Sequence, residues 1–217
     1  MLSKKKTLEA LELMKEMYPD AEGELRAETP FQYLVAVMLS AQATDASVNK
    51  ATPNLFEAYS TPHALAQADE ADIRDLIRTI GLYKTKAKNI KKTAQEIDTT
   101  YQGQVPTTIK ELMKLPGVGQ KTANVVAGDL FNVPAIAVDT HVERISKRLR
   151  ICKKSATLQE VETELMKKIP KEEWVLAHHT MILFGRYHCV ARSPKCTTCP
   201  LIELCLEGQQ RLKKQAN

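Results

Sequence analysis

The chain has 217 residues, 43% of them hydrophobic, and a formal net charge of +5 at pH 7. This length allows one large domain or two small ones, and no run of eighteen apolar residues predicts a membrane span. Residues 1–19 lack the apolar core of a signal peptide and have the pattern of an amphipathic helix. We therefore expect an intracellular, cytoplasmic protein. Its modest positive charge favours a polyanionic partner without requiring one.

Helical periodicity runs through the whole chain. Apolar residues recur at spacings of three and four in seven segments: 7–18, 31–42, 72–80, 109–115, 122–131, 142–151 and 158–169. Thr108 with Glu111, and Thr157 with Glu160, have the spacing of capping boxes at helix starts. Prolines separate the segments, and no sustained period-two run predicts a sheet. The pattern predicts an all-α fold of about ten helices.

The stretch LPGVGQKTANVV, residues 115–126, predicts a tight turn between two helices. Gly117 and Gly119 tolerate positive φ and let another backbone come close. The helix behind them presents unpaired N–H groups, which form a natural anion site. The turn is therefore either a phosphate seat or an ordinary helix connection, and it lacks P-loop spacing. Lys121, in the first turn of that helix, is either a solvated charge or a working amine.

Positive charge gathers in the segment YKTKAKNIKK, residues 83–92. On a helix, Lys86 is offset from the other four lysines, which lie broadly on one side: Lys84, Lys88, Lys91 and Lys92. Such a face can follow a phosphate backbone, and affinity would then fall as salt rises. A solvated helix face is the alternative. A second basic run follows further on, formed by Arg144, Lys147 and Arg148.

Four of the five cysteines lie close together near the C-terminus: Cys189, Cys196, Cys199 and Cys205. In a reducing compartment this crowding indicates metal ligation rather than disulfides. Zinc and a four-iron cluster can both take four cysteines, although zinc sites usually use two C-x2-C pairs and only one is present. Cys152 stands apart and is expected to be a small buried apolar residue.

Five motifs in order resemble one known family. They are LSAQATD at 39–45, GLYKTKAKNI at 81–90, the glycine turn with Lys121, VDTHV around Asp139, and the C-x6-C-x2-C-x5-C cluster. Together they are similar to the helix-hairpin-helix DNA glycosylases of base-excision repair. The similarity is greatest to the endonuclease III branch, a DNA glycosylase and AP lyase family for oxidised pyrimidines, and extends from about residue 20 to 205.

The resemblance implies a two-domain, all-α helix-hairpin-helix DNA glycosylase fold. A six-helix barrel would span 22–133, and residues 1–21 with 134–217 would form an iron-sulfur domain. It decides the cofactor in favour of a [4Fe–4S] cluster held by the four grouped cysteines. The implied substrate is double-stranded DNA with damaged pyrimidines or abasic sites. We expect a monomer, associated with the nucleoid in a prokaryote, whose active site lies in a cleft between the domains.

The resemblance assigns Lys121 and Asp139 as the catalytic pair. A lysine amine can attack C1′ of the sugar and retain it as a Schiff base, which permits β-elimination. An ordinary lysine, with a pKa of about 10.4, needs desolvation or cationic neighbours to become neutral. A nearby carboxylate would oppose that change. Asp139 therefore fits better as a proton acceptor, or as an anion that faces the developing positive charge of the oxocarbenium ion.

Further roles follow from the same resemblance. The damaged base must leave the stack, and Gln42 and Leu82 would fill the gap. His141 would line the site or contact a phosphate. The remaining expected DNA contacts are Gly117, Gly119, Lys84, Lys88, Lys91, Arg144, Arg192 and Lys195.

These roles have alternatives in which the residues are structural or the protein is of another class. Taken alone, Lys121 would be a solvated charge and Asp139 the N-cap of a helix that begins near Thr140. The related adenine-mismatch glycosylases share the hairpin and the cluster, but they lack the hairpin lysine. A non-catalytic DNA-binding or redox-sensing protein would need neither Lys121 nor Asp139 for turnover.

Overall fold

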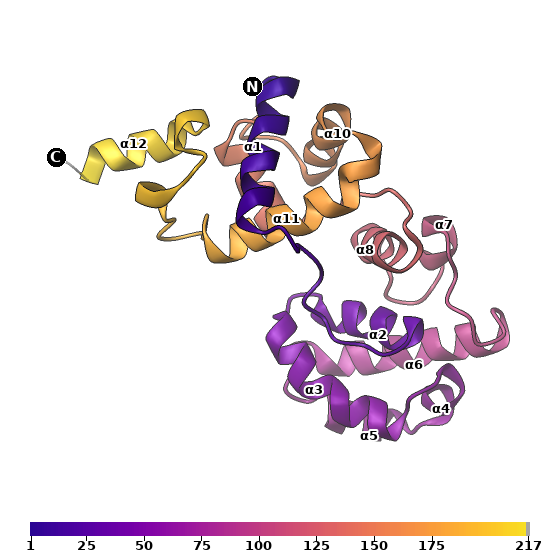
Figure 1. Ribbon diagram of the computed structural model, residues 1–217. Coiled ribbons are helices and arrows are strands. Elements are labelled where there is room, and N and C mark those ends of the chain that lie inside the picture. The colour runs from indigo at the N-terminus through magenta and orange to yellow at the C-terminus, as the bar shows by residue number, and fades with distance from the viewer. Residues whose placement is uncertain (216–217) are drawn as a thin grey trace. The chain divides into compact units, whose positions relative to one another are not determined.

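The computed structural model describes residues 1–215 and confirms the all-α prediction (Figure 1). This part of the chain holds twelve α-helices and three short 3₁₀ turns, and no strand. No helix in it is both long enough and apolar enough to cross a membrane. The chain divides into two compact units, one formed by residues 24–133 and the other by residues 1–23 with the chain from Pro134 onward.

The unit of residues 24–133 contains helices α2 to α8. Their bounds are Pro30–Ser40, Asp45–Ala58, Pro62–Gln67, Glu70–Leu76, Tyr83–Thr99, Ile109–Leu112 and Gln120–Phe131. Helix α2 contacts α3, α6 and α8, and α4 packs along α6 (Figure 1). Fully buried apolar side chains such as Leu34, Leu39, Ile90 and Val126 form its core. Because α2 is apolar on nearly every side, it is enclosed by its neighbours.

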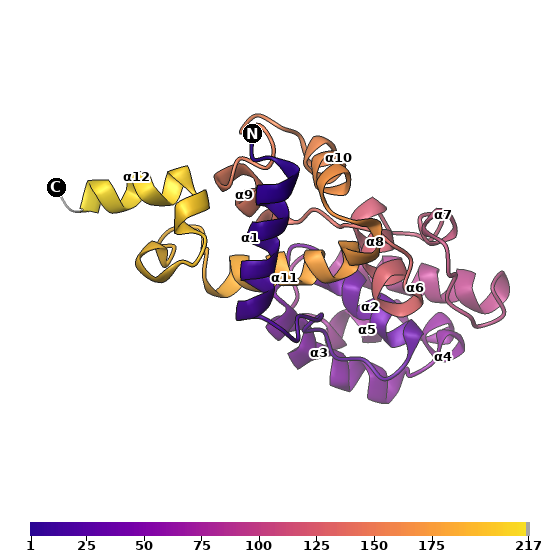
Figure 2. The same cartoon turned by 45° about the horizontal axis from the view of Figure 1, so that its top comes forward.

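The second unit joins the N-terminal helix to the C-terminal part of the chain. Its helices are α1 (Lys4–Met17), α9 (Thr140–Arg148), α10 (Leu158–Lys168), α11 (Trp174–Tyr187) and α12 (Leu206–Gln215). Helix α1 lies across α11 and beside α10, in both views (Figures 1 and 2). Leu11, Met14, Ile145 and Phe184 are buried in one core. Cys152 belongs to that core at 2% exposure, as its isolation in the sequence predicted.

Side-chain oxygens cap most of the helices. Among α1 to α10, eight N-caps accept a hydrogen bond from the first turn: Ser3, Thr29, Thr44, Thr61, Asp69, Thr108, Asp139 and Thr157. The two without a side-chain cap are α6, which begins after Leu82, and α8, which begins after Gly119. Each of these two helix starts lies in a turn for which DNA contact was predicted. Their first-turn N–H groups are therefore not satisfied by a capping side chain.

Only one of the two predicted capping boxes is complete. Thr157 and Glu160 bond reciprocally at the start of α10. At α7, Thr108 accepts from the Glu111 N–H, but the Glu111 carboxylate does not return the bond. It accepts instead from the Tyr101 hydroxyl and the Lys114 ammonium, each at 2.7 Å. The Tyr101 hydroxyl and the Lys114 ammonium therefore bind the Glu111 carboxylate in place of the Thr108 backbone N–H.

Candidate functional site

The glycine turn connects α7 to α8 with one left-handed residue. Gly117 has φ +80°, and a Cβ added there would lie 2.7 Å from Nδ2 of Asn89. Gly119 has φ −92°, and a Cβ there would meet nothing within 4 Å. Thr93 on α6 donates to the Pro116 carbonyl at 2.8 Å and ties the turn to the helix beneath. Gly117 is therefore required by packing and conformation, whereas Gly119 faces open space.

Lys121 is the second residue of α8 and is exposed to solvent. Within residues 24–133 no ion pair involves Lys121. Behind it, Ala123 and Val126 are fully buried and anchor the helix in the core. The helix register thus presents Lys121 on the free side of an uncapped helix start.

Asp139 is the N-cap of α9, which confirms the structural prediction for this residue. Its Oδ1 accepts from the backbone N–H groups of His141 and Val142, at 2.9 and 2.8 Å. Both bonds use the same oxygen, and the second oxygen accepts no hydrogen bond from the described residues of its own unit. The half-buried carboxylate is therefore oriented by its capping role while one oxygen stays available.

Gln42 and Leu82 sit in two neighbouring turns of the unit 24–133. Both are non-glycine residues in the left-handed region, with φ of 55° and 60°. A Cβ built on Gly81 would lie 3.8 Å from the Gln42 carbonyl oxygen, which places the turns in contact. Leu82 is 60% exposed. A strained backbone that presents a large apolar side chain to water is unusual unless another molecule covers it.

The lysines of α6 divide as the helical spacing predicted. Lys84 and Lys88 are exposed and Lys91 is half-buried. Lys86 is only 7% exposed, and its ammonium donates to the Leu39 carbonyl at 2.9 Å. Burial lowers the pKa of Lys86 from its ordinary value. Lys86 is therefore part of the interior and does not belong to the surface lysine row.

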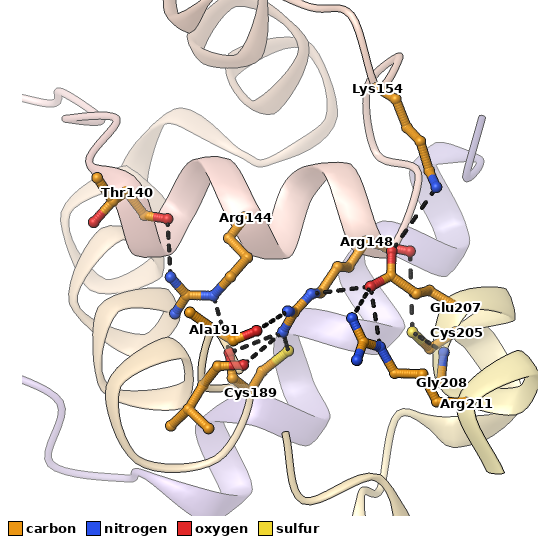
Figure 3. A network of polar contacts seen from close by, with 11 residues as sticks. Thr140, Arg144, Arg148, Lys154, Cys189, Ala191, Cys205, Glu207, Gly208 and Arg211 are labelled. Carbon is orange, nitrogen blue, oxygen red and sulfur yellow. Dashed lines mark hydrogen bonds and ion pairs between the residues drawn. The ribbon is translucent and has the colours of Figure 1, made fainter. Parts of the chain in front are cut away.

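Arg144 is largely engaged within its own unit (Figure 3). Its guanidinium donates to the carbonyls of Cys189, Thr140 and Gly185, and contacts Nδ1 of His141 at 3.0 Å. Four of its five N–H groups are used in this way. The geometry makes Arg144 a brace between α9, α11 and the cysteine loop, with one donor left for an external partner.

The four grouped cysteines line one small cavity with Arg148 and His188. Within residues 1–215, no three ligating side chains meet closely enough to hold a single metal ion. Four cysteines around one cavity suit a cluster, in which each cysteine binds a different iron. Burial is the largest of the causes that raise the pKa of Cys199, to about 11. Such thiols become thiolates only if bound cations supply positive charge, as cluster irons do.

Donors around the cavity also fit sulfur. An Arg148 N–H lies 3.3 Å from Sγ of Cys189, and the Gly208 N–H lies 3.3 Å from Sγ of Cys205. His188 is 5% exposed, and its Nε2 is buried with no hydrogen-bond partner among the described residues. Hydrogen bonds to cluster sulfurs are a known means by which proteins tune such centres.

Arg148 was grouped with a basic run in the sequence, yet its side chain is only 10% exposed. It donates to the carbonyls of Cys189, Val190 and Ala191, and its Nε pairs with Glu207 on α12 at 3.2 Å (Figure 3). Glu207 also pairs with Arg211 and Lys154, as Figure 3 shows. These contacts clamp the start of the cysteine loop between α9 and α12.

Arg192 and Lys195 lie on that loop and are exposed, so both remain available for external contacts. The Lys195 backbone N–H bonds the His188 carbonyl at 3.1 Å and closes the loop. Sequence reasoning missed the supporting residues Glu207 and His188. The only sequence signal for Glu207 was a single acid among the basic residues after Cys205.

Comparison with known proteins places this geometry in one family. Residues 35–171 match the HhH-GPD superfamily of base excision DNA repair proteins, and residues 189–205 match the iron-sulfur binding domain of endonuclease III. Endonuclease III of Bacillus subtilis (strain 168) is 52% identical over 99% of this chain and 98% of its own length. The Escherichia coli (strain K12) protein is 44% identical over 94% of this chain and 96% of its own length.

Solved structures agree. A trapped covalent intermediate of endonuclease III with DNA superposes with a TM-score of 0.95 at 55% identity, covering 98% of this chain and all of that one. A thermostable thymine-DNA glycosylase, 22% identical, shares the fold with a TM-score of 0.80, over 95% of this chain and 97% of its own. The chain therefore belongs to the endonuclease III family of helix-hairpin-helix base-excision repair enzymes, which are DNA glycosylases and AP lyases with a [4Fe–4S] cluster.

Proposed function

We propose that this enzyme removes oxidised pyrimidines from duplex DNA and then cleaves the strand by β-elimination, with Lys121 as the nucleophile. The observation that carries the assignment is the exposed Lys121 amine at the second position of α8, a helix whose start has no side-chain cap. A relative 55% identical to this chain has been solved as a covalent intermediate with DNA. Covalent attachment requires a nucleophile in the enzyme.

In the proposed reaction the Lys121 nitrogen forms a bond to C1′ while the bond from C1′ to the base breaks. The departing base takes the electron pair and then a proton, and the amine loses a proton. Ring opening gives a Schiff base between Lys121 and C1′. Loss of a proton from C2′ then expels the 3′ phosphate, and water releases the sugar. Asp139 provides the anion opposite the developing positive charge or accepts the amine proton.

Asp139 suits that role because its cap bonds involve one oxygen only. The capping N–H groups fix the orientation of the carboxylate. The second oxygen is then free to face the sugar. One residue can therefore serve as helix cap and as catalyst, and the two sequence interpretations do not compete.

We propose that Gln42 and Leu82 enter the duplex where the damaged base has left it. The exposed Leu82 side chain and the two adjacent left-handed turns support this role. Phosphate contacts are assigned to the uncapped glycine turn, to basic side chains of α6 and α9, and to two basic side chains of the cysteine loop. They are Gly117, Gly119, Lys84, Lys88, Lys91, His141, Arg144, Arg192 and Lys195.

We assign the [4Fe–4S] ligands to Cys189, Cys196, Cys199 and Cys205, which line one cavity. When bound, the cluster supplies cations that neutralise four thiolates and thereby holds the loop in shape. The loop then presents Arg192 and Lys195 for DNA. We further propose that the protein is a monomer and that it works in the cytoplasm, where its DNA substrate lies in a prokaryotic nucleoid. Sedimentation of the purified protein tests whether it is monomeric.

Borohydride trapping on DNA with a single oxidised pyrimidine tests the catalytic assignment. Lys121→Ala should form no covalent adduct and should not nick abasic DNA. Lys114→Ala is the matched control, because Lys114 is an exposed lysine at the same hairpin and, among the described residues, pairs only with Glu111. It should trap like the wild type. An undiminished adduct with Lys121→Ala would overturn the assignment.

A further inference from the structure

Lys86 is a buried lysine that pairs with no carboxylate among the residues that the structure describes. Its side chain is 7% exposed, and the Leu39 carbonyl, at 2.9 Å, is the one hydrogen-bond partner of its ammonium within residues 1–215. Burying a charge costs free energy unless it is paired, and burial alone lowers the pKa of this lysine. An apolar side chain of similar length would avoid that cost. The retained ammonium therefore calls for a role other than stability.

The bond to Leu39 completes the end of α2. Leu39 lies in the last turn of that helix, which ends at Ser40, and its C-cap Ala41 makes no capping backbone bond. Carbonyls in a last helical turn lack partners, and a cation there interacts favourably with the helix dipole. Lys86, which lies 47 residues further along the chain, thus supplies the donor for the Leu39 carbonyl at this helix end. Gln42 follows directly, with φ 55°.

Lys86 is also tied to the other turn. Its backbone N–H donates to the Leu82 carbonyl at 3.0 Å, in the first turn of α6. Leu82 is the left-handed residue from which that helix starts. One residue therefore bonds the turn of Leu82 through its backbone and the end of α2, before Gln42, through its side chain. The two turns themselves meet where Gly81 approaches the Gln42 carbonyl.

We propose that Lys86 is a positioning residue for base extrusion, which sets the spacing of Gln42 and Leu82. The inference rests on the proposed function of these two side chains as the wedge in the duplex. A wedge acts only if both side chains reach the gap together, and small displacements of a site can cost large factors in rate. Lys86 fixes their relative position while touching neither the DNA nor the reacting atoms.

Lys86→Met removes the donor and keeps the length of the side chain. Lys50→Met is the matched control, since Lys50 is an exposed lysine on α3 of the same unit. Single-turnover excision of an oxidised pyrimidine is measured opposite its normal partner and opposite a mismatched base, together with nicking of a preformed abasic site. Extrusion is most costly for the well-paired base and least for a mispaired or missing one.

The expected result is a loss of about tenfold in excision from the normal pair for Lys86→Met. Excision from the mismatch and nicking of the abasic site should change by less than about threefold, and Lys50→Met should match the wild type on all three. Lys86→Gln has a shorter side chain that cannot reach Leu39, so it should show the same selective loss of excision from the normal pair. It replaces Lys86→Met in the experiment if that variant does not fold. Equal losses on all three substrates, or no loss, would overturn the proposal.

Two further variants separate this inference from the function on which it rests. Gln42→Ala and Leu82→Ala should each reduce excision from the normal pair. If both are neutral, the wedge assignment itself fails. If both are impaired while Lys86→Met is normal, only the positioning role fails. Because Lys86 acts through Gln42, the double variant with Gln42→Ala should lose little more than Gln42→Ala alone.

Discussion

Replacing Gly117 by alanine should destabilise the unit that carries the glycine turn. Gly117 has φ +80°, a conformation that L-residues with a Cβ adopt at a cost. The added methyl would also lie 2.7 Å from Nδ2 of Asn89 and 2.9 Å from its Cβ and Cγ. Asn89 sits on α6 and its Cβ cannot rotate away. The turn or the helix beneath it must therefore move.

The magnitude follows from these two causes. The left-handed conformation costs about 1–2 kcal/mol for a residue with a Cβ. Forcing an extra methyl into an occupied space adds about 1–3 kcal/mol. Together they predict that Gly117→Ala lowers the free energy of unfolding by roughly 2–5 kcal/mol. With a urea dependence of about 2 kcal/mol per M, the midpoint should fall by about 1–2.5 M.

Urea unfolding followed by circular dichroism measures this loss, and Gly119→Ala is the internal comparison. Gly119 has φ −92° and an added Cβ there meets nothing within 4 Å. Its replacement should leave stability unchanged or raise it by about 0.4–1 kcal/mol, because the unfolded chain loses freedom. If Gly117→Ala were as stable as Gly119→Ala, the packing argument for the turn would be refuted.

Four further outcomes are expected. Gly119→Ala should weaken binding to abasic DNA several-fold without any loss of stability, as titration would show, because its methyl projects into the space assigned to a phosphate. Asp139→Asn should keep its cap but lose base excision, whereas Asp139→Ala should also lose about 0.5–2 kcal/mol in urea unfolding. Glu207→Gln removes the carboxylate that pairs with Arg148, so the visible absorbance of the cluster should decay faster under chelator than in the wild type. Because the pKa of Lys86 is lowered in the folded protein, the unfolded chain binds the Lys86 proton more tightly than the folded chain does. Between that pKa and 10.5, urea stability of the wild type should therefore rise with pH relative to Lys86→Met.

Much of the fold could be predicted because helix formation depends on near neighbours. Apolar spacing located the helical segments, and short-range rules identified Asp139 and Thr157 as caps. The same rules failed at Glu111, whose carboxylate bonds Tyr101, ten residues earlier in the chain. A capping box is complete only when no other donor within reach binds the Glu side chain more favourably than the backbone N–H of the N-cap residue.

Recognition of the candidate site also came from short motifs. The glycine turn, VDTHV and the cysteine spacing are each contained within a few residues of sequence, and the comparisons bear out the family they indicated. What the motifs could not supply was the support around the site. Helical spacing set Lys86 apart from the surface lysines, but it did not reveal that the side chain is buried against Leu39.

The sequence by itself thus determined the helices, the hairpin, the cysteine set and the family, because each is encoded by residues close together in the chain. Only the tertiary structure decided which charges are interior. Lys86 meets Leu39 and Arg148 meets Glu207 across long stretches of chain, and no local pattern reports such contacts. Burial depends on how distant segments pack, and packing turns a lysine or an arginine from a surface charge into a fixed support for the turns and loops that we propose face DNA.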